Sequence, residues 1–237
     1  AHARGAGRLT AAAALANRWQ QRYGYGFNVR DIHLLGHLAS DPLRNLLLRR
    51  QLKLELSQII AARRKNTPAG FLGRTSKFRR GVLVDFDSQV EILSMVDLWN
   101  LALINEMMSR LRYRMALKIV IRRDREDVQT QWGGLISYDQ GKAEAKLYRP
   151  GERTGDDAYV PSQRFDNDAI DCMCFFVAHF ARGYRGAAGP TKEELAFSKK
   201  QNLYGLAMTS LSGNRVNATY FNPRGTVIDL GDFSLEP

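Results

Sequence analysis

The sequence predicts an α+β fold, with long amphipathic and buried helices, a β-hairpin and short C-terminal strands. Three observations carry this prediction: long stretches of helical periodicity between residues 42 and 113, two alternating segments around a tight turn, and short strand-like segments near the C-terminal end. Apolar residues make up 44% of the 237 residues, as in proteins with a packed core. We divide the chain into a basic, mostly helical N-terminal region, residues 1–80, and an α+β core domain, residues 81–237.

Helices dominate the predicted N-terminal region. Residues 9–21 include an alanine run, and residues 31–39 form a second, short helix. A Ser-Asp-Pro sequence then combines a capping residue with a proline in the first turn of a helix over residues 42–65. Residues 66–80 follow as a loop.

The helix over residues 42–65 is predicted to be amphipathic. Most of its apolar side chains share one sector of a helical wheel, namely Leu43, Leu47, Leu48, Leu52, Leu54 and Ile59. Four cations share the opposite sector, namely Arg49, Arg50, Lys53 and Arg64. Leu46, Leu56 and Ile60 lie near the basic sector, so that sector is not purely polar. We expect the first sector to face the core and the cations to face solvent.

The core domain begins with a predicted strand at residues 82–86. A helix then runs from Ser88 to about Tyr113, with Glu91 in the capping-box position. This helix is apolar on nearly all sides, which is typical of a helix central to a core or buried in an assembly. Alternating apolar residues predict a further strand at residues 115–121.

A β-hairpin and a mixed C-terminal part complete the predicted domain. The hairpin pairs residues 132–138 with residues 143–148. Residues 168–182 form the most apolar stretch, which we interpret as a buried helix because it is too short and polar to span a bilayer. The remaining predicted elements are a helix over residues 191–201 with a capping box, and strands at residues 205–210, 216–221 and 226–230.

The positive charge is concentrated in the first third of the chain. Residues 1–80 hold 16 Lys and Arg against 3 Asp and Glu, which gives +13, whereas residues 81–237 hold 19 against 21, which gives −2. A concentrated positive field attracts phosphate polymers by coulombic steering and counterion release. We therefore expect a nucleic-acid partner, with RNA favoured over DNA. An acidic protein partner, and a solvated basic face without a ligand, stay open as alternatives.

Nine cations and four aromatic residues form the predicted nucleic-acid site. The predicted phosphate contacts are Arg49, Arg50, Lys53, Arg63, Arg64, Arg74, Lys77, Arg79 and Arg80. The predicted base-stacking residues are Tyr23, Tyr25, Phe27 and Phe78. The glycines between the first three aromatics also suit an ordinary turn whose rings pack on the core. The cations at the end of helix 42–65 are explained in part by the helix dipole, without any ligand.

A metal-dependent nuclease is the competing enzyme hypothesis. A carboxylate that precedes Glu-x-Lys on a strand can bind Mg²⁺ and position water, and Asp139, Glu144 and Lys146 have this order. Strand alternation places Glu144 and Lys146 on one face, but Asp139 also suits a turn residue. We expect no catalytic residue and no cofactor, because no phosphate-loop or dinucleotide-binding motif occurs.

Histidine and cysteine spacings offer weaker metal and redox hypotheses. His33 and His37 lie one helical turn apart, a spacing that can hold zinc, and Cys172 and His179 could share a helix face. Cys172 and Cys174 are poorly placed to pair with each other, so the sequence excludes a disulfide framework and favours a reducing, intracellular compartment. The acid-free, arginine-rich first thirty residues resemble an organelle transit peptide or a retained basic arm, so cytoplasm and organelle matrix both stay open.

The sequence thus predicts a non-catalytic nucleic-acid-binding protein, such as a structural subunit of a ribonucleoprotein or nucleocapsid-like assembly. The predicted buried helix over residues 88–113 could add a homo-oligomeric or hetero-oligomeric contact, and no membrane partner is expected. The alternatives are the nuclease and an assembly protein whose basic region docks on an acidic protein.

Overall fold

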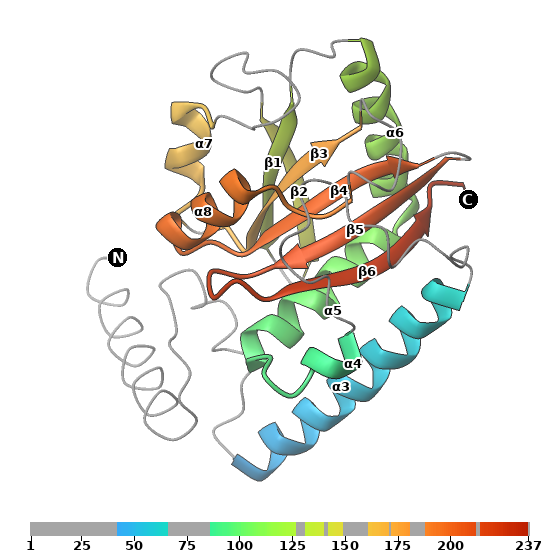
Figure 1. Ribbon diagram of the computed structural model, residues 1–237, viewed down its shortest axis with the longest axis vertical. Helices are drawn as coiled ribbons and strands as arrows, with labels where there is room; N and C mark the ends of the chain where they lie inside the picture. Colours follow the sequence, from blue (N-terminus) through green and yellow to red (C-terminus); the bar gives the residue numbers. More distant parts are fainter. Residues whose placement is uncertain are drawn as a thin grey trace.

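Helices cover both faces of a six-stranded mixed sheet in the computed structural model (Figure 1). The structure describes residues 42–65, 86–126, 131–139, 142–148, 161–170, 172–180, 188–211 and 214–236. The helices predicted at residues 9–21 and 31–39, and nearly all of the strand predicted at residues 82–86, lie outside these ranges. The α+β class predicted from the sequence is confirmed.

The sheet has the strand order β2-β1-β3-β4-β5-β6. The strands are β1 (Trp132–Asp139), β2 (Lys142–Tyr148), β3 (Cys174–His179), β4 (Gly205–Leu211), β5 (Arg215–Phe221) and β6 (Val227–Ser234). Neighbouring strands are antiparallel except β3 and β4, which are parallel and are joined through helix α8 (Lys192–Gln201). The predicted β1–β2 hairpin, the α8 capping box of Thr191 and Glu194, and the three C-terminal strands are confirmed.

Each face of the sheet supports its own core. The larger core joins the sheet to helices α3 (Pro42–Lys65), α5 (Met95–Ser109) and α6 (Leu111–Glu126), and the smaller core joins it to α7 (Gln163–Asp168) and α8. Strand β3 serves both cores, because Phe176 and Ala178 belong to the larger one while Phe175 and Val177 belong to the smaller one.

Helix α3 has the predicted bounds, but its predicted buried face is only partly correct. Leu52, Leu56 and Ile60 are buried in the larger core, whereas Leu47 and Leu54 are 57% and 60% exposed. The buried face therefore lies at the border between the predicted apolar sector, to which Leu52 belongs, and the cationic sector, near which Leu56 and Ile60 lie. Arginine and lysine tolerate this position because their aliphatic stems pack on apolar surface while their charged ends reach polar partners.

The single helix predicted over residues 88–113 is wrong, because the chain turns twice in this region. Helix α4 (Phe86–Gln89) ends early, and α5 starts at a capping box made by Ser94 and Asp97 rather than by Ser88 and Glu91. Arg110 then adopts an extended conformation that separates α5 from α6. The strand predicted at residues 115–121 lies within α6.

The buried helix predicted over residues 168–182 is also wrong. Helix α7 ends at Asp168, and the apolar stretch that follows forms the central strand β3, in which five of six residues are buried. A strand that is buried on both faces has apolar residues at successive positions instead of alternating polar and apolar ones, so its sequence cannot be told from that of a buried helix. Cys172 and Cys174 form no disulfide with each other and are buried in the two different cores. Among the described helices, none is long and apolar enough to cross a membrane.

Candidate nucleic-acid interface

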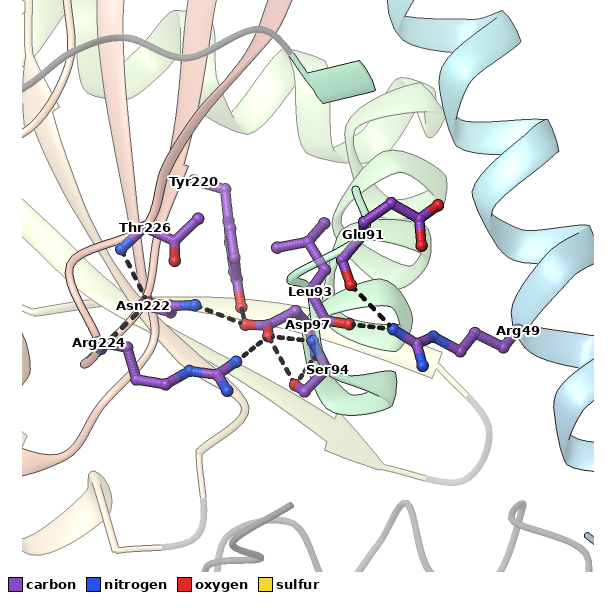
Figure 2. Close-up of polar contacts among 9 residues, drawn as sticks. All are labelled: Arg49, Glu91, Leu93, Ser94, Asp97, Tyr220, Asn222, Arg224 and Thr226. Carbon is purple, nitrogen blue, oxygen red and sulfur yellow. Dashed lines mark hydrogen bonds and ion pairs between the residues drawn. The ribbon is translucent and has the colours of Figure 1, made fainter. Parts of the chain in front are cut away.

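Three of the predicted phosphate-binding cations on α3 face the protein body. Arg49 donates two hydrogen bonds to the backbone carbonyl oxygens of Glu91 and Leu93, at 3.2 and 3.0 Å (Figure 2). Lys53 forms an ion pair of 2.7 Å with Glu91, which lowers the pKa of the Glu91 carboxyl. These contacts hold the turn between α4 and α5 against α3, so both cations have a structural role.

Arg63 is the third cation with an internal role. Its guanidinium lies 3.8 Å from the centroid of the Phe233 ring and donates a hydrogen bond to the Asn105 side chain. Burial lowers the pKa of Arg63 to about 10. By contrast, Arg50 is exposed and lines a shallow groove between α3 and the turn at Glu91.

The remaining predicted site residues fall outside what the structure describes. The Arg64 side chain belongs to this group, together with Arg74, Lys77, Phe78, Arg79, Arg80, Tyr23, Tyr25 and Phe27. Their assignment to nucleic-acid binding stays a prediction.

A basic groove lies between α6 and the sheet end where β4 turns into β5. Lys118, Arg122, Arg125 and Arg215 line this groove, which has a volume of about 360 Å³, and we call it the α6 groove. The Arg125 guanidinium donates a hydrogen bond of 2.8 Å to the Ser210 hydroxyl, so it is held in place without losing its charge to a carboxylate. Glu126 is the acidic residue on the rim.

A second groove adjoins the first through Arg215. It has a volume of about 610 Å³ and is lined by Arg63, Arg114 and Arg215 together with Phe233. Arg215 forms an ion pair of 2.8 Å with Asp232, whose side chain is fully buried. Arg114 donates to the backbone carbonyl of Glu236. The two grooves together form a surface with six cations.

Carboxylates compensate this surface only in part. Asp232 balances Arg215, and Glu126 lies 4.0 Å from Arg122, with both side chains about 70% exposed. An exposed pair of this kind is worth well under about 1 kcal/mol and is screened by salt. Among the described residues, no carboxylate pairs with Lys118 or Arg125. The surface therefore keeps an excess of positive charge.

A buried carboxylate, Asp97, links the start of α5 to the end of β5 and the β5–β6 turn. The Asp97 side chain is fully buried and accepts hydrogen bonds from the Tyr220 hydroxyl at 2.8 Å, the Asn222 amide at 3.0 Å and the Arg224 guanidinium at 2.5 Å (Figure 2). The Ser94 backbone and hydroxyl also donate to it. Because each carboxylate oxygen has partners, we interpret Asp97 as a structural link from α5 to the β5–β6 turn.

The proposed nuclease residues lie on the hairpin but are spread along it. Asp139 of β1 lies opposite Lys142 of β2 at the turn. Lys142 is four residues before Lys146 on β2, a separation of about 13 Å along the strand. Lys146 instead forms a 2.6 Å ion pair with Asp168, which lowers the pKa of Asp168 and raises that of Lys146. Glu144 is exposed.

The structure also separates the histidine and cysteine of the metal hypothesis. The His179 ring lies 2.8 Å from the buried Glu194 carboxylate, at the end of β3, rather than on a helix face with Cys172. Within the described ranges, no group of three or more His, Cys, Asp or Glu side chains is placed to hold a metal ion. His33 and His37 lie outside those ranges.

Sequence reasoning missed the cations of α6. Residues 110–126 hold seven Lys and Arg against two Asp and Glu, a local excess of +5. Acidic residues elsewhere hid this excess, because the balance was taken over residues 81–237 as a whole. A charge count in a sliding window could have found it.

The chain is thus an α+β protein with two adjoining basic grooves beside its sheet. Comparison with protein-family models finds no match, and comparison with curated proteins finds no similar sequence.

Proposed function

We propose that this chain is a non-catalytic nucleic-acid-binding protein, with RNA as the favoured ligand. We further propose that it serves as a structural subunit of a ribonucleoprotein or nucleocapsid-like assembly. The observation that carries the proposal is the α6 groove, which gathers Lys118, Arg122 and Arg125 from α6 beside Arg215 of β5. The adjoining groove adds Arg63 and Arg114, which are already bonded within the fold. Guanidinium groups match phosphate geometry, and neutralised phosphates release counterions on binding.

The α6 groove is the part of this surface best suited to phosphate. Lys118 and Arg125 carry charges that no described carboxylate compensates, and Ser210 and Asn214 add polar groups beside them. The basic loop that contains Lys77, Arg79 and Arg80 is the second proposed contact, and it rests on the sequence alone. The nuclease alternative has less support, because Lys146 is held by Asp168.

Binding across a salt series tests the groove. The affinity of a labelled single-stranded RNA, and of a duplex DNA, is measured by fluorescence anisotropy for the wild type and for a Lys118→Gln/Arg122→Gln/Arg125→Gln variant. Three lost phosphate contacts should reduce the slope of log affinity against log salt by about two units for the RNA. Affinity should fall uniformly across RNA sequences, since phosphate contacts carry no base information.

A variant of equal charge provides the control. Lys192→Gln/Lys199→Gln/Lys200→Gln also removes three exposed cations, but from α8 on the other face of the sheet. It should keep a salt slope close to that of the wild type. If both variants lose affinity equally, binding follows net charge and the groove is not the site. If the wild type binds neither ligand at moderate salt, the proposed function is wrong.

The loop is tested in the same way, with a charge-reversed Lys77/Arg79/Arg80 variant. If the loop is a phosphate contact, the RNA salt slope should drop by about two units in this variant as well. An unchanged slope would remove these three residues from the proposed site and leave the groove to account for binding.

A further inference from the structure

Three large apolar side chains are exposed in a line on α6. Leu111, Met115 and Ile119 are 50%, 48% and 47% exposed, and they follow one another at intervals of four residues. Residues four apart lie on the same side of a helix, so the three form one stripe about 12 Å long. The buried residues Leu117 and Val120 lie on the opposite side of the helix. The stripe therefore has no function in the core.

Cations border this stripe along both of its edges. On a helical wheel, Arg112 and Arg123 lie on one side of the line, whereas Lys118 and Arg125 lie on the side that faces the α6 groove. Arg112 and Arg123 are exposed, and no described carboxylate pairs with either of them. An apolar line between two cationic edges is the pattern of one helix in an interhelical contact.

The apolar stripe and its cationic edges indicate what kind of ligand could bind this face of α6. Aliphatic side chains cannot stack bases as aromatic rings do, so the stripe adds little to nucleic-acid binding. A second copy of α6 packed on the first would bring cations against cations, and like charges in contact are unfavourable. An amphipathic helix with an apolar line and acidic edges satisfies both features at once.

We propose that the exposed face of α6, centred on Leu111, Met115 and Ile119, docks an acidic amphipathic helix of a partner protein. The apolar line of the partner covers the stripe, and its carboxylates pair with Arg112 and Arg123. The proposal does not depend on the RNA-binding function, because Leu111, Met115 and Ile119 do not line the α6 groove, which borders the stripe at Lys118 and Arg125. The two ligands can therefore be tested separately.

A pair of synthetic helices provides the probe. Both contain about three heptads with leucine at the core positions, one with glutamate at the flanking positions and one with lysine. We expect the full chain to bind the glutamate-flanked helix and not the lysine-flanked one. A Met115→Ser/Ile119→Ser variant should weaken this binding by tenfold or more, since each buried apolar side chain contributes about tenfold to affinity. Ile170→Ser, which alters an exposed apolar residue next to α7 and away from α6, is the control and should bind normally.

A charge-reversal variant tests the electrostatic part. Arg112→Glu/Arg123→Glu should lose the glutamate-flanked helix and gain the lysine-flanked one. The substituted side chains are all exposed, so far-ultraviolet circular dichroism should show that all variants remain folded. RNA affinity should stay unchanged in the Met115→Ser/Ile119→Ser variant.

Three results would overturn the proposal. The first is failure of the wild type to bind the glutamate-flanked helix, or equal binding of both helices. The second is loss of RNA affinity in the Met115→Ser/Ile119→Ser variant, which would assign the stripe to nucleic acid. The third is a wild-type dimer in analytical ultracentrifugation that this variant converts to a monomer, which would show that a second copy covers the stripe.

Discussion

Removal of the Asp97 carboxylate should be among the most destabilising single changes in this protein. Asp97→Ala leaves the Tyr220 hydroxyl and the Asn222 amide without their acceptor, and both residues are at most 1% exposed. An unsatisfied buried donor costs about 1–3 kcal/mol. Loss of the bond from Ser94 to Asp97 at the start of α5 adds about 1 kcal/mol. Arg224 contributes less, because its side chain is 55% exposed and can turn to water.

These contributions add up to about 3–7 kcal/mol in the free energy of unfolding. Single domains are stable by only about 5–15 kcal/mol, so the variant should unfold at much lower urea concentration. Urea titration monitored by circular dichroism measures this shift, with Ser94→Ala as the matched control. Ser94→Ala removes the cap hydroxyl but leaves the Tyr220 and Asn222 contacts, and it should cost only about 1 kcal/mol. If the two variants were equally stable, the carboxylate would act as a helix cap alone, and the reasoning from buried donors would be refuted.

The remaining predictions concern thiols, the α4–α5 turn and pH. Both cysteines are buried, and burial also raises the pKa of Cys174. Both thiols should therefore react with Ellman's reagent at pH 8 only after denaturation, as absorbance would show. Arg49→Ala removes two charge-assisted bonds to backbone carbonyls and should cost about 1–3 kcal/mol in a urea titration, whereas Arg50→Ala should cost almost nothing. The ion pair with Lys146 lowers the pKa of Asp168 in the folded state. The pair therefore stabilises the fold fully above the pKa that Asp168 has in the unfolded chain, and this stabilisation disappears as the pH falls through the lower folded pKa. Asp168→Asn should lower the melting temperature at pH 7 but not at strongly acidic pH.

Local signals predicted those elements whose ends are defined by side-chain chemistry. Thr191 and Glu194 stand at capping-box spacing and start α8 as expected. The turn that joins β1 to β2 has strongly alternating segments on either side, and its register follows. Such signals act within a few residues, so they survive without knowledge of the tertiary structure.

The prediction for residues 168–182 failed because β3 is buried on both faces of the sheet and therefore lacks the alternation of polar and apolar residues that marks a strand. The segment that contains β3 reads as a continuous apolar run, because one side of it packs under α5 and α6 and the other under α7 and α8. Periodicity cannot separate such a strand from a buried helix. The opposite ambiguity affected residues 115–121. The buried members Leu117, Val120 and Ile121 stand at helical spacing, but the alternation of Met115, Leu117 and Ile119 in the same short segment also suits a strand.

The candidate site, too, could be predicted from the sequence only in part, because the sequence gives the number of cations but not their contacts. Net charge predicted where cations are numerous but not where their charged ends point, and Arg49, Lys53 and Arg63 turn out to hold α3 onto the core. A cation already bonded within the fold would have to give up that bond to contact phosphate, so these three are poorer ligands than their number implies. Lys118 and Arg125 face no carboxylate partner among the described residues, and the bond from Arg125 to the neutral Ser210 hydroxyl leaves its charge uncompensated, although both cations lie in a part of the chain whose total charge is negative. The proposed interface therefore rests on which cations keep their charge uncompensated, and this is a property of the fold rather than of the composition.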